Sequence, residues 1–260
     1  MISLREKAEE LGIALTDRQL AQFEIYYELL TEKNKVMNLT AITEREDVIL
    51  KHFVDSLALV KAECGFSSQK ILDVGTGAGF PGIPLKIAFP GLKIVLLDSL
   101  NKRVKFLQEV IDALELHDIT AVHGRAEDYA RQKEYREQFD LVVSRAVANL
   151  STLSEYCLPY VKVSGMFLPY KSGRIEEEMR EGKHAVYLLG GEIEDVVSFV
   201  LPGTDMERTI LKIKNKRQPR SAIRAKQGCR QKSRSVKKRF CRLSGLHRDF
   251  PDEAGVLTLL

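Results

Sequence analysis

Four glycines lie within eight positions of the chain, at Gly75, Gly77, Gly79 and Gly82. They follow the apolar run "KILDV", which contains Asp73, and they precede the helix-like run "IPLKIAF". Glycine inside a regular element lowers stability, so such a cluster indicates either a sharp bend or a backbone that a ligand approaches closely. Where a strand passes into a helix, the first N–H groups of the helix lack partners and can bind a ligand. This loop is therefore the first candidate binding site, and a bend without a ligand is the alternative.

The next strand-like run, "KIVLLD" at residues 93–98, ends in the acid Asp98. An acid at this place can accept hydrogen bonds from both hydroxyls of a ribose, and it can equally cap a helix that begins near Leu100. A glycine loop followed by such an acid is typical of NAD enzymes and of S-adenosylmethionine (AdoMet) methyltransferases. Because an acid precedes the first glycine in "DVGTGAGFPG", the loop favours AdoMet over a pyrophosphate. The predicted cofactor-binding residues of this region are Asp73, Gly75, Gly77, Gly79 and Asp98.

The fourth strand-like run, "FDLVVS" at residues 139–144, should face the group that is transferred, and Arg145 and Ala146 follow it. Its end lacks both a carboxylate and the Asn/Asp-Pro-Pro-aromatic motif of many methyltransferases that modify amino groups of nucleic acids. An exocyclic amine needs help to become a nucleophile, whereas N7 of guanine has a free lone pair and no proton to lose. Transfer to N7 therefore needs mainly alignment with the sulfonium methyl group.

The elements that must position these residues are apolar strand-like runs that alternate with amphipathic helical runs from residue 70 onward, which predicts a parallel sheet covered on both faces. These runs lie at residues 70–75, 93–98, 119–124, 139–144 and 165–170, followed by two antiparallel strands around Pro202 and Gly203. Helical patterns precede them, one beginning at Thr16 or Asp17 and one over residues 44–61. We predict an α/β fold of the class I AdoMet-dependent methyltransferase type. It is Rossmann-like, with a mostly parallel seven-stranded sheet in residues 66–214 and an N-terminal helical extension in residues 1–65.

The composition of the 260-residue chain, 44% hydrophobic and 29% charged, is that of a soluble globular protein. The sequence shows neither a signal peptide nor an apolar stretch long enough to cross a bilayer, so we expect a cytoplasmic protein without membrane contact. Four scattered cysteines form no CxxC pair, so we expect neither disulfides nor a metal site. The net charge of +4 is uneven, because residues 215–260 carry +10 and residues 1–214 carry −6. A basic tail of this kind suggests nucleic acid as a partner.

The chain resembles the bacterial glucose-inhibited division protein B family in seven ordered motifs over about residues 1–214: "VMNLTAI", "HFVDSL", "ILDVGTGAGFPGIPLKI", "LLDSLNKRVKFL", "HGRAED", "FDLVVSRAVA" and "LPYKSG". That family methylates N7 of a guanine in the 530-loop region of 16S ribosomal RNA. The resemblance implies AdoMet as the cofactor, and 16S rRNA or the small ribosomal subunit as the partner. It implies that Gly75 and Phe80 contact AdoMet from the first loop. It also implies that Ala126 and Glu127 lie at the adenine end and that Arg145 lines the site.

Basic residues near the predicted strand ends are candidates for RNA contact. Arg125, Arg145, Lys171 and Arg208 can together meet phosphate oxygens, and we place Arg145 and Lys171 first as contacts of the target base or its phosphates. On the helix after Asp98, the run Lys102, Arg103 and Lys105 forms either a solvated face or a phosphate contact.

Five other residues have a structural and a functional interpretation. Phe80 either anchors the core or lies beside the cofactor, and we favour the cofactor. Asn38 and Thr40 either cap a turn or lie by the cofactor entrance, with equal support. His52 and Asp55 share a helical face three residues apart, which fits a structural hydrogen bond better than a metal site.

The basic tail, residues 215–260, departs from the family, whose members typically end in a segment like TPKxYPRKAGxPxKxPL. In another frame, the codons permitted for residues 218–230 allow T-P-K-R-Y-P-R-K-A-G-L-P in order. We therefore predict a frame shift near Lys216 or Arg217, which makes residues 217–260 an out-of-frame and poorly ordered segment. A genuine basic RNA-binding extension is the alternative, and the nucleotide sequence around codon 216 distinguishes the two.

Other functions stay open at this point. One is AdoMet-dependent methylation of another RNA or of a small molecule, and another is a nucleoside-binding regulator without catalysis. An NAD-dependent oxidoreductase is disfavoured by the loop pattern. We expect the protein to be a monomer.

Overall fold

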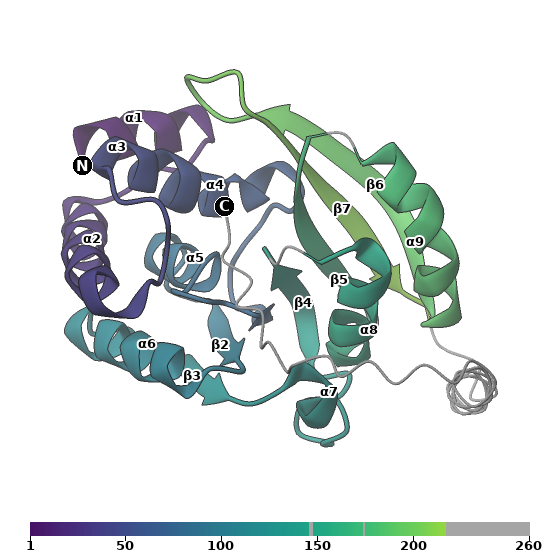
Figure 1. Cartoon of the computed structure of the whole chain (residues 1–260). Helices are drawn as coiled ribbons and strands as arrows, with labels where there is room; N and C mark the ends of the chain where they lie inside the picture. The colour runs from purple at the N-terminus through teal and green to yellow at the C-terminus, as the bar shows by residue number, and fades with distance from the viewer. Residues whose placement is uncertain (146–147, 174, 217–260) are drawn as a thin grey trace, which may run out of the picture. The chain divides into compact units, whose positions relative to one another are not determined.

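A seven-stranded sheet in the order β3-β2-β1-β4-β5-β7-β6 forms the centre of the computed structural model, which describes residues 1–145, 148–173 and 175–216 (Figure 1). The strands are β1 (Lys70–Val74), β2 (Lys93–Asp98), β3 (Ile119–His123), β4 (Phe139–Ser144), β5 (Val161–Ser172), β6 (Gly191–Val200) and β7 (Glu207–Asn215). Strands β1 to β5 pair in parallel, and β7 runs antiparallel to both β5 and β6. The prediction of a mostly parallel seven-stranded sheet is therefore confirmed.

The register of the parallel strands brings their carboxyl ends to one edge of the sheet. Val74 of β1 pairs with Leu97 of β2, and Asp98 of β2 pairs with His123 of β3. The loops that follow β1, β2, β3 and β4 consequently meet at this edge. In open α/β sheets this is the edge at which ligands bind.

Helices cover both faces of the sheet (Figure 1). The helices are α1 (Ile2–Glu10), α2 (Asp17–Met37), α3 (Arg45–Val48), the π-helix η1 (Ile49–Val54), α4 (Asp55–Leu57), the 3₁₀-helix η2 (Ala58–Lys61), α5 (Gly82–Ala88), α6 (Asn101–Ala113), α7 (Ala126–Tyr129), α8 (Leu150–Cys157), the 3₁₀-helix η3 (Leu158–Tyr160) and α9 (Glu176–Leu188). One buried cluster joins Ile71 of β1 to Phe23 of α2, and a second joins Leu72 of β1 to Leu153 of α8. Because successive strand residues point to opposite faces, α2 and α8 cover opposite faces of the sheet.

Two of the N-terminal helical runs begin where the sequence predicts. Thr16 is the N-cap of α2, and it forms a capping box in which Thr16 Oγ1 accepts from the Gln19 backbone and the Gln19 side chain accepts from the Thr16 N–H. The second predicted run is continuous helical chain from Arg45 to Lys61 in four segments. One compact unit comprises residues 1–217, so these helices share a core with the sheet.

Residues 217–260, 174 and 146–147 lie outside the described residues, and so do the predictions made for the tail and for Ala146. Within the described part of the chain, no helix is both long and apolar enough to cross a membrane.

Substituting Gly82 tests how tightly the start of α5 packs on the sheet. A Cβ at Gly82 would overlap the side chain of Leu96 and lie 3.0 Å from Asp73 Oδ2. Both neighbours are buried, so we expect Gly82→Ala to lower the free energy of unfolding by about 1–3 kcal/mol through overpacking. Urea unfolding measures this change, and a stability equal to that of the unsubstituted protein would contradict the packing.

Candidate cofactor and substrate site

A cavity of about 340 Å³ lies at the carboxyl ends of β1 to β4. The strands and the loops that follow them contribute Val74, Gly75, Leu97, Ser99, Gly124, Arg125, Ala126, Glu127 and Ser144, and the chain around α8 contributes Ala148, Leu153 and Tyr156. The lining is mostly apolar with a few polar groups, as in small-molecule sites generally. Of the predicted site residues, Gly75, Arg125, Ala126 and Glu127 are thus brought together at one cavity.

The four loop glycines divide into two pairs with different physical roles. Gly75 and Gly77 have φ values of +71° and +62°, and a Cβ at Gly77 would meet no atom within 4 Å. A ligand can therefore approach the backbone at Gly77, and Gly75 lines the cavity itself. Gly79 instead packs closely, because a Cβ there would lie 2.8 Å from Tyr26 Oη, and Gly82 packs on β2. We conclude that the second pair lets the loop and α5 sit against the core.

Asp98 holds the glycine loop and the start of the next helix at the same time. Its Oδ2 accepts a hydrogen bond from the Gly77 N–H at 2.9 Å, and its Oδ1 accepts from the Leu100 N–H at 2.9 Å. Arg103 lies 3.5 Å from Oδ2. Leu100 is the N-cap of α6, so Asp98 holds the turn before the helix and does not cap it. Each oxygen keeps a lone pair for a ribose hydroxyl.

Asp73 lies beneath the loop with no exposed surface. Its Oδ2 accepts from Thr76 Oγ1 at 2.7 Å and from the Gly82 N–H at 2.9 Å, whereas its Oδ1 is buried without a hydrogen-bond partner among the described residues. Burial, opposed by the Thr76 hydrogen bond, raises the pKa of Asp73 to about 7. In its ionised form Asp73 has a buried oxygen without a partner beneath the glycine loop, so a ligand that brings positive charge, as AdoMet does, would favour that form.

Helix α7, which follows β3, and helix α8 contribute another part of the cavity lining. Ala126 and Glu127 open helix α7 and line the cavity, which agrees with the adenine end that the family resemblance implies. Sequence reasoning missed Leu153 and Tyr156, which come from α8. The signal that could have placed α8 is Asn149, whose side chain caps the helix by accepting from the Thr152 N–H.

Phe80 is packed into an aromatic cluster with the N-terminal helices. Its ring stacks on His52 at 4.4 Å between centroids and lies 5.5 Å from Tyr26 and 6.1 Å from Phe53. Only 7% of its surface is exposed. The structure therefore supports the core interpretation, which the sequence favoured less, because the neighbouring aromatic rings hold the side chain. A cofactor contact of Phe80 stays a prediction.

Arg145 is turned toward the N-terminal helices. It donates to the carbonyl oxygens of Lys51 (3.1 Å) and His52 (3.2 Å) and to Ser56 Oγ (3.0 Å), and it pairs with Asp55 at 3.4 Å. Its side chain is 17% exposed. Buried acceptors from the helical extension already engage the guanidinium, and contacts of Arg145 with AdoMet, the target base or its phosphates stay predictions.

Lys171 and Arg208 are also engaged within the protein. Lys171 Nζ donates to the Ala148 carbonyl at 2.7 Å and to Glu178 at 2.6 Å, and Arg208 Nε donates to Asp55 Oδ1 at 2.7 Å. These internal partners supply the anion or carbonyl that a buried cation needs beside it, and RNA contacts of the two residues stay predictions. Arg125 and Lys102 are exposed, and they stay candidates for phosphate contact.

His52 is a structural hydrogen-bonding residue, as the sequence favoured. Its Nδ1 lies 3.4 Å from an Arg145 nitrogen, which can only donate, so the proton is assigned to Nε2, which lies 2.8 Å from Thr40 Oγ1. This hydrogen bond links Thr40 to η1. Asn38 ends α2 in the left-handed conformation, with φ of 49°. Burial lowers the pKa of His52 to about 3, so the ring is neutral at pH 7.

Replacing His52 by glutamine tests this neutral ring. In the unfolded chain histidine binds a proton below about pH 6.5, whereas the folded protein resists protonation down to about pH 3. His52 therefore lowers stability as the pH falls through that range. We expect His52→Gln, which keeps one acceptor and one donor, to lose less stability than the unsubstituted protein between pH 6.5 and 4. Urea unfolding at each pH measures it, and parallel pH profiles would contradict the assignment.

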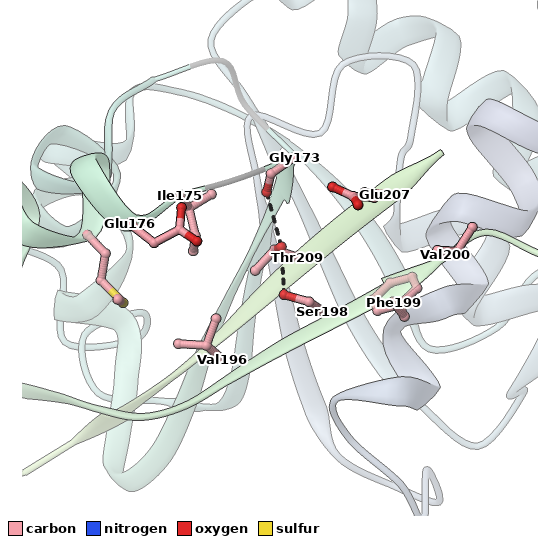
Figure 2. Close-up of a pocket in the computed structure, with 10 residues that line it drawn as sticks. Gly173, Ile175, Glu176, Val196, Ser198, Phe199, Val200, Glu207 and Thr209 are labelled. Carbon is pink, nitrogen blue, oxygen red and sulfur yellow. Dashed lines mark hydrogen bonds between the residues drawn. The ribbon is translucent and has the colours of Figure 1, made fainter. Parts of the chain in front are cut away.

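A second cavity, of about 280 Å³, lies between the start of α9 and strands β6 and β7 (Figure 2). Its floor is a hydrogen-bonded chain in which Thr209 bonds to the Gly173 carbonyl and to Ser198. It shares no lining residue with the cavity at the carboxyl ends of β1 to β4, so it is distinct from the candidate cofactor site. Among the described residues, no group of three or more His, Cys, Asp or Glu side chains could hold a metal ion.

Comparison with known proteins shows the family and the fold. The GidB family, described as rRNA small subunit methyltransferase G, matches residues 19–210. A relative from Lachnoclostridium phytofermentans named ribosomal RNA small subunit methyltransferase G is 59% identical over 83% of this chain and 89% of its own length. One of the same name from Bacillus cytotoxicus is 52% identical over 80% of this chain and 87% of its own length.

Similarity to solved structures adds evidence on the fold alone. A candidate methyltransferase from Bacillus halodurans superimposes with a TM-score of 0.50 at 14% identity, over 63% of this chain and 99% of its own. Its likeness agrees with the class I methyltransferase type predicted for the sheet. Since the family match spans most of the chain and the relatives are matched over most of their lengths, the chain belongs to the GidB family, rRNA small subunit methyltransferase G.

Proposed function

We propose that the chain transfers the methyl group of AdoMet to N7 of a guanine in the 530-loop region of 16S ribosomal RNA. Family membership supports the reaction class and the rRNA substrate. The observation that carries the proposal is the cavity at the carboxyl ends of β1 to β4, where Gly75, Ala126 and Ser144 meet. That position is where an open α/β sheet binds a nucleoside.

The residues at this cavity suit AdoMet in charge and shape. Gly75 and Gly77 leave the loop backbone open to the ligand, and Asp98 has lone pairs for the ribose hydroxyls. The unpartnered Oδ1 of Asp73 is an acceptor for an N–H donor at the loop. When bound, AdoMet supplies an electrophilic methyl group on a sulfonium ion.

The protein's own contribution to catalysis is alignment. N7 of guanine has a lone pair and loses no proton on methylation, so no general base is required, and the end of β4 carries no carboxylate. Holding the two reactants in line can supply much of the rate enhancement of such a transfer. For the RNA, the exposed Arg125 and Lys102 are now the first candidates for phosphate contact, ahead of the three internally paired cations.

Three further features belong to this proposal. We place the enzyme in the cytoplasm, where its ribosomal substrate is, and we infer that it acts as a monomer. Residues 1–65 serve as a helical extension that shares a core with the methyltransferase domain, and that domain extends through Asn215, the last residue of β7.

Labelled AdoMet tests the proposed reaction when it is incubated with naked 16S rRNA, the assembled small subunit or free nucleotides. We expect 7-methylguanine from rRNA or from the subunit, and none from free nucleotides. Label only on free nucleotides would indicate a small-molecule methyltransferase. Binding of AdoMet without label in any sample would indicate a non-catalytic nucleoside-binding protein.

A further inference from the structure

We propose that Asp55 is a positioning residue for methyl transfer, which holds Arg145 and with it the end of β4 against the N-terminal helices; this inference rests on the proposed function. Asp55 is the first residue of α4 and is 5% exposed. Its two oxygens contact two arginines from different parts of the sheet. Oδ1 accepts from Arg208 Nε at 2.7 Å, and Oδ2 lies 3.4 Å from an Arg145 nitrogen.

Asp55 pairs with both arginines, so its negative charge determines whether they stay close together. Two guanidinium groups face a single carboxylate, and both arginine side chains are less than one-fifth exposed. Within the described residues, the other groups that contact Arg145 are neutral: the carbonyls of Lys51 and His52, His52 Nδ1, Ser56 Oγ and the Phe80 ring. Without the carboxylate, two buried cations lack an anion, so they should move apart.

The end of β4 is the part of the cavity that such a movement would reach. Ser144, directly before Arg145, lines the cavity and donates a hydrogen bond to the Val74 carbonyl at 2.8 Å. Ala148, three residues after Arg145, lines it as well. Arg145 therefore lies in the chain between two cavity-lining residues. Displacing it shifts the cavity wall at Ser144, and small displacements of reacting groups cost rate.

The helical segment around Asp55 also contacts other parts of the site, and these contacts fix the geometry of the site. Ser56 accepts through its carbonyl from Tyr170 of β5 at 2.8 Å, and the His52 ring stacks on Phe80 of the glycine loop. Ala126 and Glu127, at the adenine end of the cavity, belong instead to α7, which lies against α8. We therefore expect the loss of Asp55 to affect transfer more than cofactor binding.

The test compares Asp55→Asn, Asp55→Glu and a control, Asp140→Asn. Asp140 lies near the start of β4, away from the carboxyl edge, and pairs with Lys162 at 2.7 Å. We expect Asp55→Asn to lower kcat on 16S rRNA at least tenfold, while the Kd for AdoMet measured by calorimetry changes less than threefold. Asp55→Glu keeps the charge and should recover part of kcat. The control should retain both values.

A double-mutant cycle tests whether Asp55 acts through Arg145. In an Arg145→Lys background, adding Asp55→Asn should lower kcat by much less than tenfold, because the group it positions is already changed. Equal factors in both backgrounds would overturn the inference, and so would a kcat for Asp55→Asn equal to that of the unsubstituted enzyme. If Asp55→Asn does not fold, Arg145→Lys decides: because Asp55 is proposed to act through the Arg145 guanidinium, an unchanged kcat in that variant overturns the inference. An unsubstituted enzyme that methylates no substrate overturns the proposed function, which separates the two failures.

Discussion

Gly75→Val is expected to abolish tight AdoMet binding while leaving a folded protein. Gly75 lines the cavity and has φ of +71°, a conformation that β-branched residues rarely adopt. The branched side chain would both strain the loop and take up space in a cavity of about 340 Å³. We expect the Kd for AdoMet to rise at least about 100-fold, equivalent to about 2.7 kcal/mol, with a parallel loss of methyl transfer. Calorimetry measures the binding, and circular dichroism checks that the fold is kept.

Gly65→Val is the matched control for this experiment. Gly65 also has a positive φ, +76°, and a Cβ there would meet no atom within 4 Å, but it lies in the loop before β1 and not at the cavity. It should carry a similar backbone strain and keep AdoMet affinity within about threefold. Equal losses in both variants would mean that backbone strain, and not the cavity at Gly75, controls binding.

The sheet was predictable from the sequence because its signals are local. Apolar runs such as residues 70–75 and 139–144 mark buried strands wherever they pair, and the Thr16 cap with Gln19 three residues on marks the start of α2. The two antiparallel strands follow from the turn at Pro202 and Gly203 in the same way. The position of the glycine loop at a strand-to-helix junction also depends only on neighbouring residues.

Which charged side chains form ion pairs inside the protein was not predictable, because the pairing depends on contacts between distant segments. Arg208 and Asp55 are 153 positions apart, and nothing at either position indicates that they pair. The positions of Arg145 and Lys171 near strand ends suggest free cations, yet their partners come from η1, α4 and α9. Similarly, spacing could not show that Gly77 faces open space while Gly79 packs against side chains.

Asp73→Asn is expected to change the pH dependence of stability by several kcal/mol. The pKa of Asp73 is about 7 in the folded protein, mainly because of burial, against an ordinary value of 3.8 for an aspartate in water. Between these values the folded state keeps a proton that the unfolded state releases, so this group lowers stability as the pH rises from about 4 to 7. One pKa unit corresponds to about 1.4 kcal/mol, so the total is roughly 4 kcal/mol. Urea unfolding should show Asp73→Asn gaining stability over the unsubstituted protein across this range, with a constant difference above pH 7.

His52 opposes Asp73 in the pH dependence of stability, so the unsubstituted protein alone would not show either contribution clearly. Its pKa is about 3 in the folded state, so it raises stability as the pH rises toward 6.5, opposite to Asp73. The two slopes overlap between about pH 4 and 6.5 and oppose each other there. Asp73→Asn should therefore reveal a rising profile, and His52→Gln a falling one.

Thr76→Val removes a hydrogen bond that lowers the pKa of Asp73, so it should extend the pH range in which stability falls to above pH 7. A profile for Asp73→Asn that stays parallel to the unsubstituted one would show that Asp73 ionises at its ordinary pKa, and the loop would then hold a buried carboxylate instead of a neutral carboxyl.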